Sequence, residues 1–395
     1  MSGAILSVNS GSSSIKFGLF DVVDGQPELS ARGKLEKIGI SPRLEIRDRE
    51  DATIASREWA GQSDLTHEDL LENLFDWAPD NLPRREIAAI GHRVVHGGTE
   101  FTRPILIDDD ALEKLDGLCA LAPLHQPDNL AAIRAMARLA PGMPQVACFD
   151  TAFHATMPAV ASRIALPRRF AEQGIRRYGF HGLSYEYVAA RLHELDPELA
   201  RGRVIAAHLG NGASMCAMLD GRSVDTTMGF TALDGLVMGT RCGTLDPGVV
   251  LHLVQHEGLS ASEAEDLLYR ESGLLGLSAS SSDMRALHAS EDPQAVEAVE
   301  TFVWSAAHHA AALCASLGGL DAMVFTAGIG ENDPLIRAAI AARLEWLGVV
   351  VDEAANQRNA QVISAPQSKV AMLVIPTDEE SMIARHTLSL ASAGV

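Results

Sequence analysis

The first notable feature of the chain is a polar stretch set between two apolar ones. The segment "ILSVNSGSSSIKFGLFD", residues 5–21, places Gly and Ser residues between an apolar run and the alternating Ile15, Phe17 and Leu19. This pattern predicts a strand, a turn and a second strand. The same order of features returns about two hundred residues later as "VIAAHLGNGASMCAMLDG". The repetition favours two related domains from an internal duplication over a chance pair of hairpins.

Strand and helix patterns alternate in the rest of the chain. "EIAAIGHRVVHGG" and "PQVACFDTAFH" predict buried strands that end in polar residues, and "DNLAAIRAMARLA" predicts a helix that ends at Pro141. Further on, "AVEAVETFVWSAAHHAAALCASLGG" predicts a long helix closed by glycines, and "LDAMVFTAGIG" predicts a strand. A helix from about Pro334 follows, with Asp333 as its N-cap. These patterns predict an α/β fold with a domain boundary near residue 150.

Composition limits the classes of function. Of 395 residues, 47% are hydrophobic and 21% charged, as in a packed globular protein, and the net charge of -20 opposes non-specific binding to nucleic acid or anionic lipid. No apolar run approaches the roughly 18 residues of a membrane span, and no targeting segment is recognised. We therefore expect a cytoplasmic protein with no nucleic-acid partner and no membrane. The five cysteines lack C-x-x-C spacing, which favours neither disulfides nor a zinc site.

Three turns rich in backbone N–H groups are candidates for binding a nucleotide polyphosphate. They are residues 9–16, 208–214 and 327–332. The first is not a Walker P-loop, because Lys16 follows three serines with no second glycine before it. In the third, "AGIGEN" precedes a predicted helix, so backbone N–H groups are expected to face an anion there. An ordinary strand-to-helix connection is the alternative.

Carboxylates at the ends of predicted strands are candidate magnesium ligands. Asp150 follows "ACF", and either Glu379 or Glu380 follows "MLVIPTD". Mg²⁺ takes one or two protein oxygens beside phosphate oxygens and water, so sparse carboxylates near phosphate-binding turns suit it. His92 and His96 would lie roughly 13 Å apart on a strand, which is too far to share zinc.

Two arginines and one histidine are candidates for contact with anionic groups. Arg93 and Arg241 stand among glycines and small residues, which suits guanidinium groups that meet carboxylate or phosphate oxygens. His181, in "RRYGFHGLSYEYV", could donate a hydrogen bond to charge that develops on a transferred group. Surface arginines and a structural core histidine are the alternatives.

Taken together, these motifs resemble the acetate kinase family, within the superfamily of actin, sugar kinases and heat-shock chaperone ATPases. The resemblance covers nearly the whole chain. Its motifs appear in the family's order as "VNSGSSSIKF", "GHRVVHGG", "LAPLHQP", "FDTAFH", "RRYGFHG", "HLGNGAS", "MGFTALDGLVMGTR", "SSDMR", "AGIGEN" and "PTDEE". The resemblance implies two duplicated actin-like domains with an active-site cleft between them. It also implies domains of residues 1–150 and 151–383, a C-terminal helix of about 384–395 packed on the first domain, and a homodimer.

The resemblance further implies roles for individual residues. Asn9 and Glu379 would lie near the metal, and Asp150, His181 and Arg241 would be catalytic. The substrate-binding residues that it implies are Arg93, Val95, Leu124, His125 and Phe180. The nucleotide-binding residues that it implies are Lys16, His208, Leu209, Gly210, Asn211, Gly212, Asp283, Met284, Arg285, Gly328, Ile329, Gly330, Glu331 and Asn332.

The activity that the resemblance implies is a reversible phosphoryl transfer from ATP to the carboxylate of acetate, which gives acetyl phosphate and ADP. Mg²⁺ is the expected cofactor, with Mn²⁺ as an alternative. Because the acceptor is already ionised at neutral pH, direct in-line transfer needs no general base, and Asp150 could organise the metal instead of acting as acid/base. The alternatives are a kinase for propionate or another short-chain acid, a sugar kinase, and an ATP-operated binding protein.

The chain departs from the family's usual residues near three of these motifs. The departures are Leu183 for threonine, Tyr185 for histidine, Ala232 for proline, Cys242 for serine, Thr244 for aspartate and Asp378 for asparagine. The lost proline ring at Ala232 would leave room for a methylene in the acyl pocket. Tyr185 would alter hydrogen bonds around His181. Cys242, next to Arg241, is either an inert thiol or one with a lowered pKa.

Overall fold

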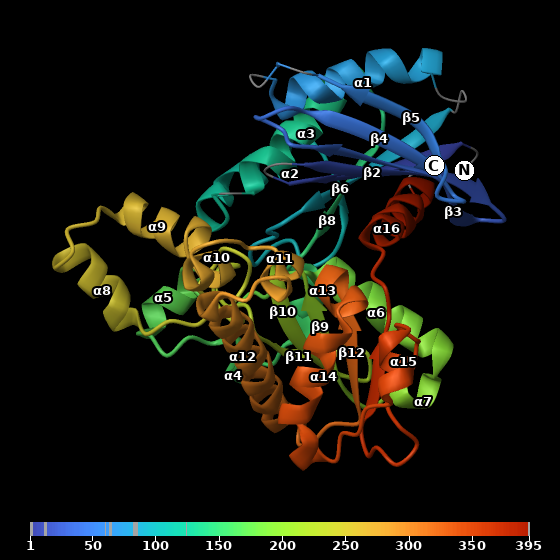
Figure 1. The fold of residues 1–395 in the computed structure, drawn as a ribbon. Coiled ribbons are helices and arrows are strands. Elements are labelled where there is room, and N and C mark those ends of the chain that lie inside the picture. The colour runs from blue at the N-terminus through green and yellow to red at the C-terminus, as the bar shows by residue number, and fades with distance from the viewer. Residues whose placement is uncertain are drawn as a thin grey trace. The chain divides into compact units, whose positions relative to one another are not determined.

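The computed structural model describes residues 3–11, 14–59, 61–62, 65–81, 86–123 and 125–393. By its contacts the chain divides into two compact units, shown in Figure 1. The first unit contains residues Met1–Phe153 and Asp378–Val395, and the second contains His154–Thr377. The division thus falls a few residues away from the expected boundaries at 150 and 383. That these units are the functional domains stays a prediction.

The first unit is built on one mixed sheet, with strand order β5-β4-β3-β2-β1-β6-β8-β7. β1 pairs with β6, and β6 with β8, in parallel, whereas the other neighbours are antiparallel. The strands are β1 (Ala4–Ser10), β2 (Ile15–Val23), β3 (Gln26–Glu36), β4 (Arg43–Asp48), β5 (Thr53–Glu58), β6 (Ile87–Val94), β7 (Ile105–Leu106) and β8 (Gln145–Phe149). The helices are α1 (His67–Asn81), α2 (Asp109–Gly117), η1 (Cys119–Leu121), α3 (Gln126–Leu139) and α16 (Glu379–Ala393), and η2 (Ala152–Thr156) spans the boundary.

Helices cover both faces of this sheet. Successive side chains of a strand point to opposite faces, so Val8 of β1 packs with α1 and α3, while Ile5 packs with Leu388 of α16. Figure 1 shows α1 and α3 on one side of the sheet and α16 on the other. The C-terminal helix begins at Glu379, five residues before the predicted start. The end of the chain therefore completes the core of the unit that the beginning of the chain forms.

The second unit is built on a sheet of order β11-β10-β9-β12-β13. β9, β12 and β13 are parallel, and β9, β10 and β11 are antiparallel. The strands are β9 (Arg203–Leu209), β10 (Ala213–Leu219), β11 (Arg222–Thr226), β12 (Ala322–Thr326) and β13 (Ala371–Val374). The helices are α4 (Ala159–Ser162), α5 (Arg168–Glu172), α6 (Gly182–Leu195), α7 (Pro197–Ala200), α8 (Pro247–Gln255), α9 (Ala261–Arg270), α10 (Gly273–Ser278), α11 (Met284–His288), α12 (Pro293–Leu317), α13 (Ala327–Asn332), α14 (Pro334–Arg343), η3 (Glu345–Leu347) and α15 (Glu353–Gln357).

The two sheets share one arrangement. The series β3-β2-β1-β6-β8 and β11-β10-β9-β12-β13 have the same order and the same pattern of antiparallel and parallel neighbours. Both predicted hairpins are confirmed, as β1–β2 and β9–β10, and this common plan supports the internal duplication. The predicted long helix is confirmed as α12, which ends at Gly318 in the left-handed conformation.

One predicted strand is too long. The sequence predicts a strand over "LDAMVFTAGIG" and, in overlap with it, a turn over "AGIGEN". In the structure β12 ends at Thr326, and "AGIGEN" forms the short helix α13. The chain turns at Ala327, where φ is 64°. The last residues of β12 that pair with sheet neighbours are Phe325, opposite Val374 of β13, and Thr326, opposite His208 of β9, so the pairing ends where the chain turns. The apolar pattern alone cannot show where sheet partners end.

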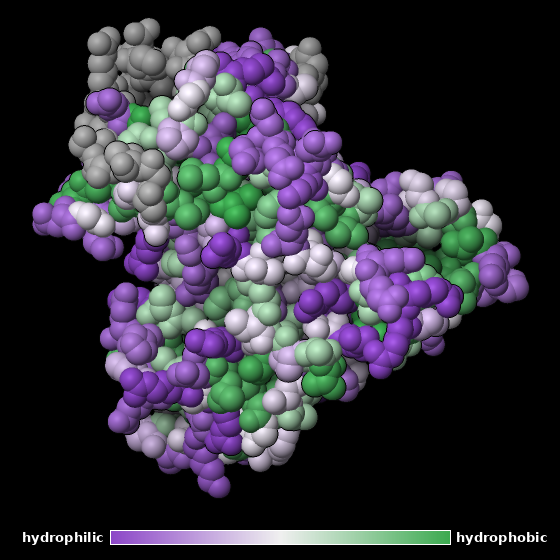
Figure 2. Space-filling model, turned by 180° about the vertical axis from the view of Figure 1, so that it is seen from behind, coloured by the Kyte–Doolittle hydropathy of each residue, from purple (hydrophilic) through white to green (hydrophobic). Residues whose placement is uncertain are grey.

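The surface and the helices were compared with what a membrane-spanning protein needs. Figure 2 shows hydrophilic residues over much of the visible surface, with hydrophobic ones interspersed among them. Individual exposed apolar residues such as Val160, Trp304 and Trp346 are ordinary on protein surfaces. Among the described residues, no helix is both long enough and apolar enough to span a bilayer.

Three buried histidines stay neutral near pH 7. Burial lowers the pKa of His92 and His96 in the first unit, and of His154 in the second, from 6.5 to about 4. His154 donates from Nε2 to the carbonyl of Phe180 at 2.9 Å, and its Nδ1 accepts from the hydroxyl of Ser223 at 2.8 Å. Protonation of any of these rings would place a charge in an apolar interior.

We predict that His154→Gln reduces the acid sensitivity of folding. Between pH 6.5 and pH 4 the unfolded chain binds a proton at this histidine that the folded chain does not, so the free energy of unfolding falls as pH falls. Loss of the ring should reduce that slope by at most about 1.4 kcal/mol per pH unit. Urea unfolding at several pH values measures it.

The matched control is His193→Gln, which changes an exposed histidine of α6. We expect this control to keep the wild-type slope. Equal slopes for His154→Gln and wild type would contradict the prediction.

Candidate active site

The carboxyl ends of three neighbouring parallel strands bring polar residues together in the first unit. Asn9 lies near the end of β1, Arg93 near the end of β6, and Asp150 directly after β8. Because β1, β6 and β8 are adjacent in the sheet and run in the same direction, these residues meet at one edge. The sequence predicted polar residues at the end of each strand separately, and the pairing of the strands brings these residues close together.

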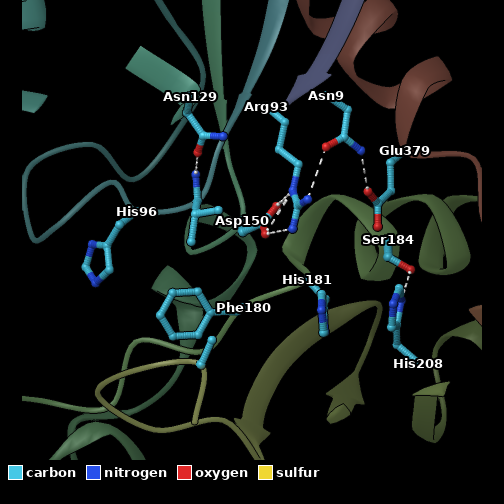
Figure 3. Close-up of polar contacts among 12 residues, drawn as sticks. Asn9, Arg93, His96, Asn129, Asp150, Phe180, His181, Ser184, His208 and Glu379 are labelled. Carbon is cyan, nitrogen blue, oxygen red and sulfur yellow. Dashed lines mark hydrogen bonds and ion pairs between the residues drawn. The ribbon is translucent and has the colours of Figure 1, made fainter. Parts of the chain in front are cut away.

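A continuous polar chain links four of the predicted residues (Figure 3). Arg93 donates from Nη2 to Asp150 Oδ2 at 2.6 Å and from Nε to Asp150 Oδ1 at 3.0 Å. Its Nη1 donates to Asn9 Oδ1 at 3.1 Å. The amide nitrogen of Asn9 in turn donates to Glu379 Oε2 at 3.2 Å. The guanidinium is thus fixed in orientation by a carboxylate on one edge and an amide on another.

The Arg93–Asp150 pair is largely removed from water. The side chain of Asp150 is 1% exposed and that of Arg93 is 20% exposed. Burial opposes the charge on Arg93, but the nearby carboxylates of Asp150, Glu379 and Glu380 outweigh this effect and raise its pKa. Arg93 therefore remains a fixed cation at the strand ends.

The structure distinguishes Glu379 from Glu380, which the sequence left as alternative candidate ligands for magnesium. Glu379 is the one hydrogen-bonded to Asn9. Glu380 Oε1 is buried without a hydrogen-bond partner among the described residues, and burial, together with the charge of Glu379, raises its pKa. Lys16 is exposed and lies opposite Asn9 in the β1–β2 hairpin. Glu379 is therefore the carboxylate that shares a site with Asn9.

Amide side chains of α3 hold this edge of the sheet in place. Asn129 accepts from the backbone N–H of Val95 at 2.9 Å and donates to the carbonyl of Ser10 at 2.6 Å. Gln126 holds the backbone of His96 through both a donated and an accepted hydrogen bond. Sequence reasoning missed both amides, although the polar positions on the otherwise apolar face of the predicted helix could have drawn attention to them.

Three further residues of the first unit were predicted to bind the substrate. Val95 is buried and follows β6, and His125 is partly exposed at the N-cap position of α3. Leu124 lies outside the described residues.

Aromatic rings and hydroxyl groups organise the predicted residues of the second unit. Phe180 is 2% exposed, and His181 has the left-handed backbone conformation, with φ of 58°. The ring of His181 stacks on that of His208, with centroids 4.1 Å apart. His181 Nδ1 lies 2.9 Å from Ser214 Oγ, and His208 Nδ1 lies 2.9 Å from Ser184 Oγ. Each imidazole is thereby fixed on one edge.

Arg241 and His181 face the same small space beside the β9–β10 turn. A methyl group built on Gly212 would lie 3.4 Å from His181 Nε2 and 3.8 Å from Arg241 Nη1. Arg241 Nη1 also donates to the carbonyl of Ala232 at 3.0 Å. Burial raises the pKa of the Cys242 thiol, which favours an inert thiol over one with a lowered pKa.

The predicted nucleotide-binding turn between β9 and β10 is closed by backbone contacts. Leu209 is fully buried at the end of β9, and Gly210 donates its N–H to the carbonyl of Gly212 at 3.1 Å. The carbonyl of Asn211 accepts from Gly239 N–H at 2.9 Å. Gly239 has no room for a side chain here, because its Cβ would lie 2.0 Å from Asn211 Oδ1.

The second predicted nucleotide segment caps α11. Asp283 accepts from the N–H of Arg285 and forms an ion pair with its side chain at 2.6 Å, while Met284 is buried. His288, at the end of the same helix, lies 2.9 Å from Asp333 Oδ2. This contact ties α11 to the start of α14 and so brings the second and third segments together.

The third segment, residues 327–332, is held from inside. Glu331 Oε1 accepts from the N–H groups of Ala327 at 2.8 Å and Thr377 at 3.0 Å, and the amide of Asn332 donates to the carbonyl of Gly328. A Cβ on Gly328 would meet nothing within 4 Å. Gly328 and Asn332 are exposed to solvent, whereas Gly330 is buried and Ile329 is partly buried.

The expected anion-facing N–H groups are not available at the start of α14. Asp333 Oδ1 accepts from both Leu335 N–H and Ile336 N–H at 3.1 Å, so the N-cap side chain already occupies them. The N-cap assignment is confirmed, and these two N–H groups are bound by the aspartate cap. Anion binding by residues 327–332 stays a prediction.

A buried arginine that sequence reasoning missed supports this third segment. Arg337 is fully buried, and its Nη1 donates to the carbonyls of Gly330 and Glu331, both at 2.9 Å. Its other N–H groups bind Asn356 and Asn359. The position lies on the apolar face of α14, where a charged residue is an exception that the sequence pattern could have revealed.

The arrangement defines the class of this protein. Two sheets of matching order, with candidate site residues at the carboxyl ends of parallel strands, form an actin-like α/β fold. The chain belongs to the acetokinase family, whose model matches residues 4–385. The fold class and the family predicted from the sequence are both confirmed.

Related proteins match this chain along its whole length. It is 53% identical to the acetate kinase of Nitrobacter hamburgensis over 389 residues, which cover 98% of this chain and 96% of the relative. It is 50% identical to the acetate kinase of Rhodopseudomonas palustris over 400 residues, which cover both chains completely.

Solved structures agree with this family. That of Porphyromonas gingivalis acetate kinase matches with a TM-score of 0.87 and 37% identity, covering 99% of this chain and 100% of the other. That of a propionate kinase from Francisella tularensis matches with a TM-score of 0.89 and 38% identity, with the same coverage.

We predict that Asn129→Leu destabilises the fold. The substitution keeps the side-chain size but leaves a buried N–H at Val95 and a buried carbonyl at Ser10 without their partners. The expected loss is about 2–4 kcal/mol of unfolding free energy, measured by urea denaturation. Asn73→Leu is the control, because that amide makes one hydrogen bond, to Asp69 O, on α1. Equal stability losses in the two variants would contradict the prediction.

Proposed function

We propose that this chain transfers the γ-phosphoryl group of ATP reversibly to the carboxylate of acetate, which gives acetyl phosphate and ADP. The observation that carries the proposal is the fixed Arg93 cation at the strand ends, in a chain about half identical to acetate kinases over its full length. A fixed, partly accessible guanidinium is the group that a small carboxylate acceptor requires.

In the proposed step, an oxygen of the acetate carboxylate attacks the γ-phosphorus of ATP. The bond from that phosphorus to the bridging oxygen breaks, and ADP leaves with the electron pair. Acetate, with a pKa near that of Glu, roughly 4.3, is ionised at neutral pH and needs no general base. Catalysis then depends on alignment and on stabilising charge in the moving group.

Arg93 places the acceptor in this proposal. Asp150 accepts from Nε and Nη2 of Arg93, and Asn9 accepts from Nη1, so the plane of the guanidinium is fixed. Nη1 and Nη2 each carry a second N–H group, and these two groups would bind acetate. Asp150 then serves to hold Arg93, in addition to the acid/base or metal-organising roles considered from the sequence. From the family resemblance alone, we also propose Val95, Leu124, His125 and Phe180 as residues that bind the acyl group.

His181 and Arg241 would contact the transferred phosphoryl group. Their Nε2 and Nη1 atoms face one space beside Gly212, which supports a joint role as hydrogen-bond donors to developing negative charge. ATP itself would lie against Lys16, the β9–β10 turn, residues 283–285 and residues 328–332.

Asn9 and Glu379 have the donor chemistry of a magnesium site. Glu379 offers carboxylate oxygens, whereas the oxygen of Asn9 accepts from Arg93 and its nitrogen faces Glu379, so Asn9 would have to turn its amide to coordinate an ion. The described residues contain no group of three or more His, Cys, Asp or Glu side chains that could form a protein-only cage. Mg²⁺ usually keeps several waters and takes only one or two protein oxygens beside phosphate oxygens, so this sparse set fits it, and Mn²⁺ as an alternative. Bound there, the ion would offset the charge of the triphosphate.

A homodimer follows as a proposal from the family resemblance alone. Light scattering on the purified chain would test it, and a monomer mass would refute it.

We predict that purified protein with ATP, Mg²⁺ and acetate forms a product that hydroxylamine converts to acetyl hydroxamate. Arg93→Lys keeps the charge but loses the planar fork, so kcat/KM for acetate should fall about tenfold to a hundredfold. The colorimetric hydroxamate assay against acid concentration measures both.

The control is Arg134→Lys, which changes a more exposed arginine of α3 paired with Asp116. It should leave kcat/KM unchanged. If no short carboxylic acid gives hydroxamate, the acid-kinase proposal fails, and a sugar kinase or an ATP-operated binding protein becomes the better explanation. If Arg93→Lys retains full activity, Arg93 does not bind the acceptor.

Propionate is the alternative acceptor. The two solved structures named above, an acetate kinase and a propionate kinase, are similar to this chain by nearly the same amounts. Ala232 stands where the family has proline, and its carbonyl contacts Arg241. A smaller side chain at this point would leave space for one more methylene.

We predict that Ala232→Pro lowers the preference for propionate over acetate by about fourfold, because one buried methylene contributes about 0.8 kcal/mol. The hydroxamate assay with acetate, propionate and butyrate gives the ratio of kcat/KM values before and after the change. An unchanged ratio would mean that Ala232 does not set the size of the acyl pocket.

A further inference from the structure

A chain of three polar side chains in the second unit ends on the imidazole of His181. Tyr185 Oη lies 2.5 Å from Ser214 Oγ, and Ser214 Oγ lies 2.9 Å from His181 Nδ1. Tyr185 and Ser214 are fully buried, whereas His181 is partly exposed. Tyr185 comes from α6 and Ser214 from β10, so the chain joins two elements behind the histidine.

The direction of these hydrogen bonds follows from the donor strengths of the two hydroxyl groups. Burial raises the pKa of Tyr185 well above 10, so the phenol keeps its proton. A phenol is more acidic than an aliphatic hydroxyl and is the better donor and the poorer acceptor, so Tyr185 donates its proton to Ser214 Oγ, 2.5 Å away. The hydroxyl of Ser214 then has its proton available for His181 Nδ1.

We propose that Tyr185 and Ser214 are positioning residues that hold neutral His181 in the tautomer with its proton on Nε2. An Nδ1 atom that accepts from Ser214 carries no proton, so the ring's single N–H is on Nε2. That atom faces the space beside Gly212 where Arg241 Nη1 also lies. The two hydroxyl groups thus turn His181 into a donor toward that space.

The backbone around His181 is fixed as firmly as its ring. His154 donates to the carbonyl of Phe180, which precedes His181, and the left-handed conformation of His181 is sparsely populated for a residue with a side chain. Such strain persists where surrounding contacts hold it and is common at functional sites. His181 is therefore held at the carbonyl before it and at Nδ1, with Nε2 directed toward Gly212.

The kind of side chain at position 185 matters for this arrangement. A buried phenol donates one proton and has one fixed direction here, whereas an imidazole has two nitrogen atoms and two tautomers of its own. The catalytic consequence rests on the proposed function, in which His181 Nε2–H donates to the moving phosphoryl group.

The test is to observe the protonation of both ring nitrogens directly. Full-length protein labelled with ¹⁵N in histidine, at pH 7.5, gives long-range ¹H–¹⁵N correlations for each imidazole, and His181→Gln identifies the signals of His181 by their loss. We expect a protonated Nε2 and an unprotonated Nδ1 in the wild type. A proton on Nδ1 in the wild type would overturn the proposal without any variant.

Two variants remove the hydroxyl groups one at a time. Ser214→Ala should let His181 populate both tautomers, and Tyr185→Phe should shift it in the same direction by a smaller amount. Tyr178→Phe is the control, because that phenol donates to Gly174 O at 2.7 Å and is not part of the chain. The proposal is wrong if the His181 signals are the same in Ser214→Ala as in wild type.

Activity distinguishes a positioning role from a structural one. Tyr185→Phe should lower kcat for acetate about threefold to tenfold, the effect of one hydrogen bond, and leave KM for ATP and acetate unchanged. Raised KM values with unchanged kcat would contradict the role. If hydroxamate forms while His181 carries its proton on Nδ1, the positioning proposal fails and the function stands. If no hydroxamate forms, the function fails and the tautomer measurement still decides the hydrogen-bond chain.

Discussion

The ion pair between Arg93 and Asp150 is the interaction on which the first unit's candidate site depends. A charge withdrawn from water is costly unless it is paired and hydrogen-bonded, and removal of one partner leaves the other uncompensated. The pair forms because β6 and β8 are adjacent and parallel, so that residues at their carboxyl ends meet. Asn9 extends the pair from β1 to Glu379 of α16, which connects the beginning and the end of the chain.

The second unit fixes its candidate residues in a different way. The imidazoles of His181 and His208 there are held by hydroxyl groups and by stacking on each other. Such contacts set the orientation of a ring. In the proposed function, alignment of an acceptor and oriented donors for the moving group are what phosphoryl transfer requires.

Local patterns predicted the elements well where the signal lies within one segment. Both hairpins, the helix α12 with its glycine end and the Asp333 cap follow from alternation, helical spacing and capping residues. The prediction was wrong at "AGIGEN", because a strand ends where its partners end and not where its apolar residues do. Buried amides and Arg337 were missed, because a polar side chain on a helix gives no sign of the distant backbone group that it binds.

The sequence by itself determined the family, the α/β class and the identity of the polar residues at strand ends, since these depend on residue types and short spacings. Only the tertiary structure decided which of those residues meet. It placed Glu379, and not Glu380, against Asn9, and it joined Tyr185 to His181 through Ser214. The physical reason is that hydrogen bonds form over about 3 Å, and residues far apart in sequence reach that distance only when strands and helices have packed.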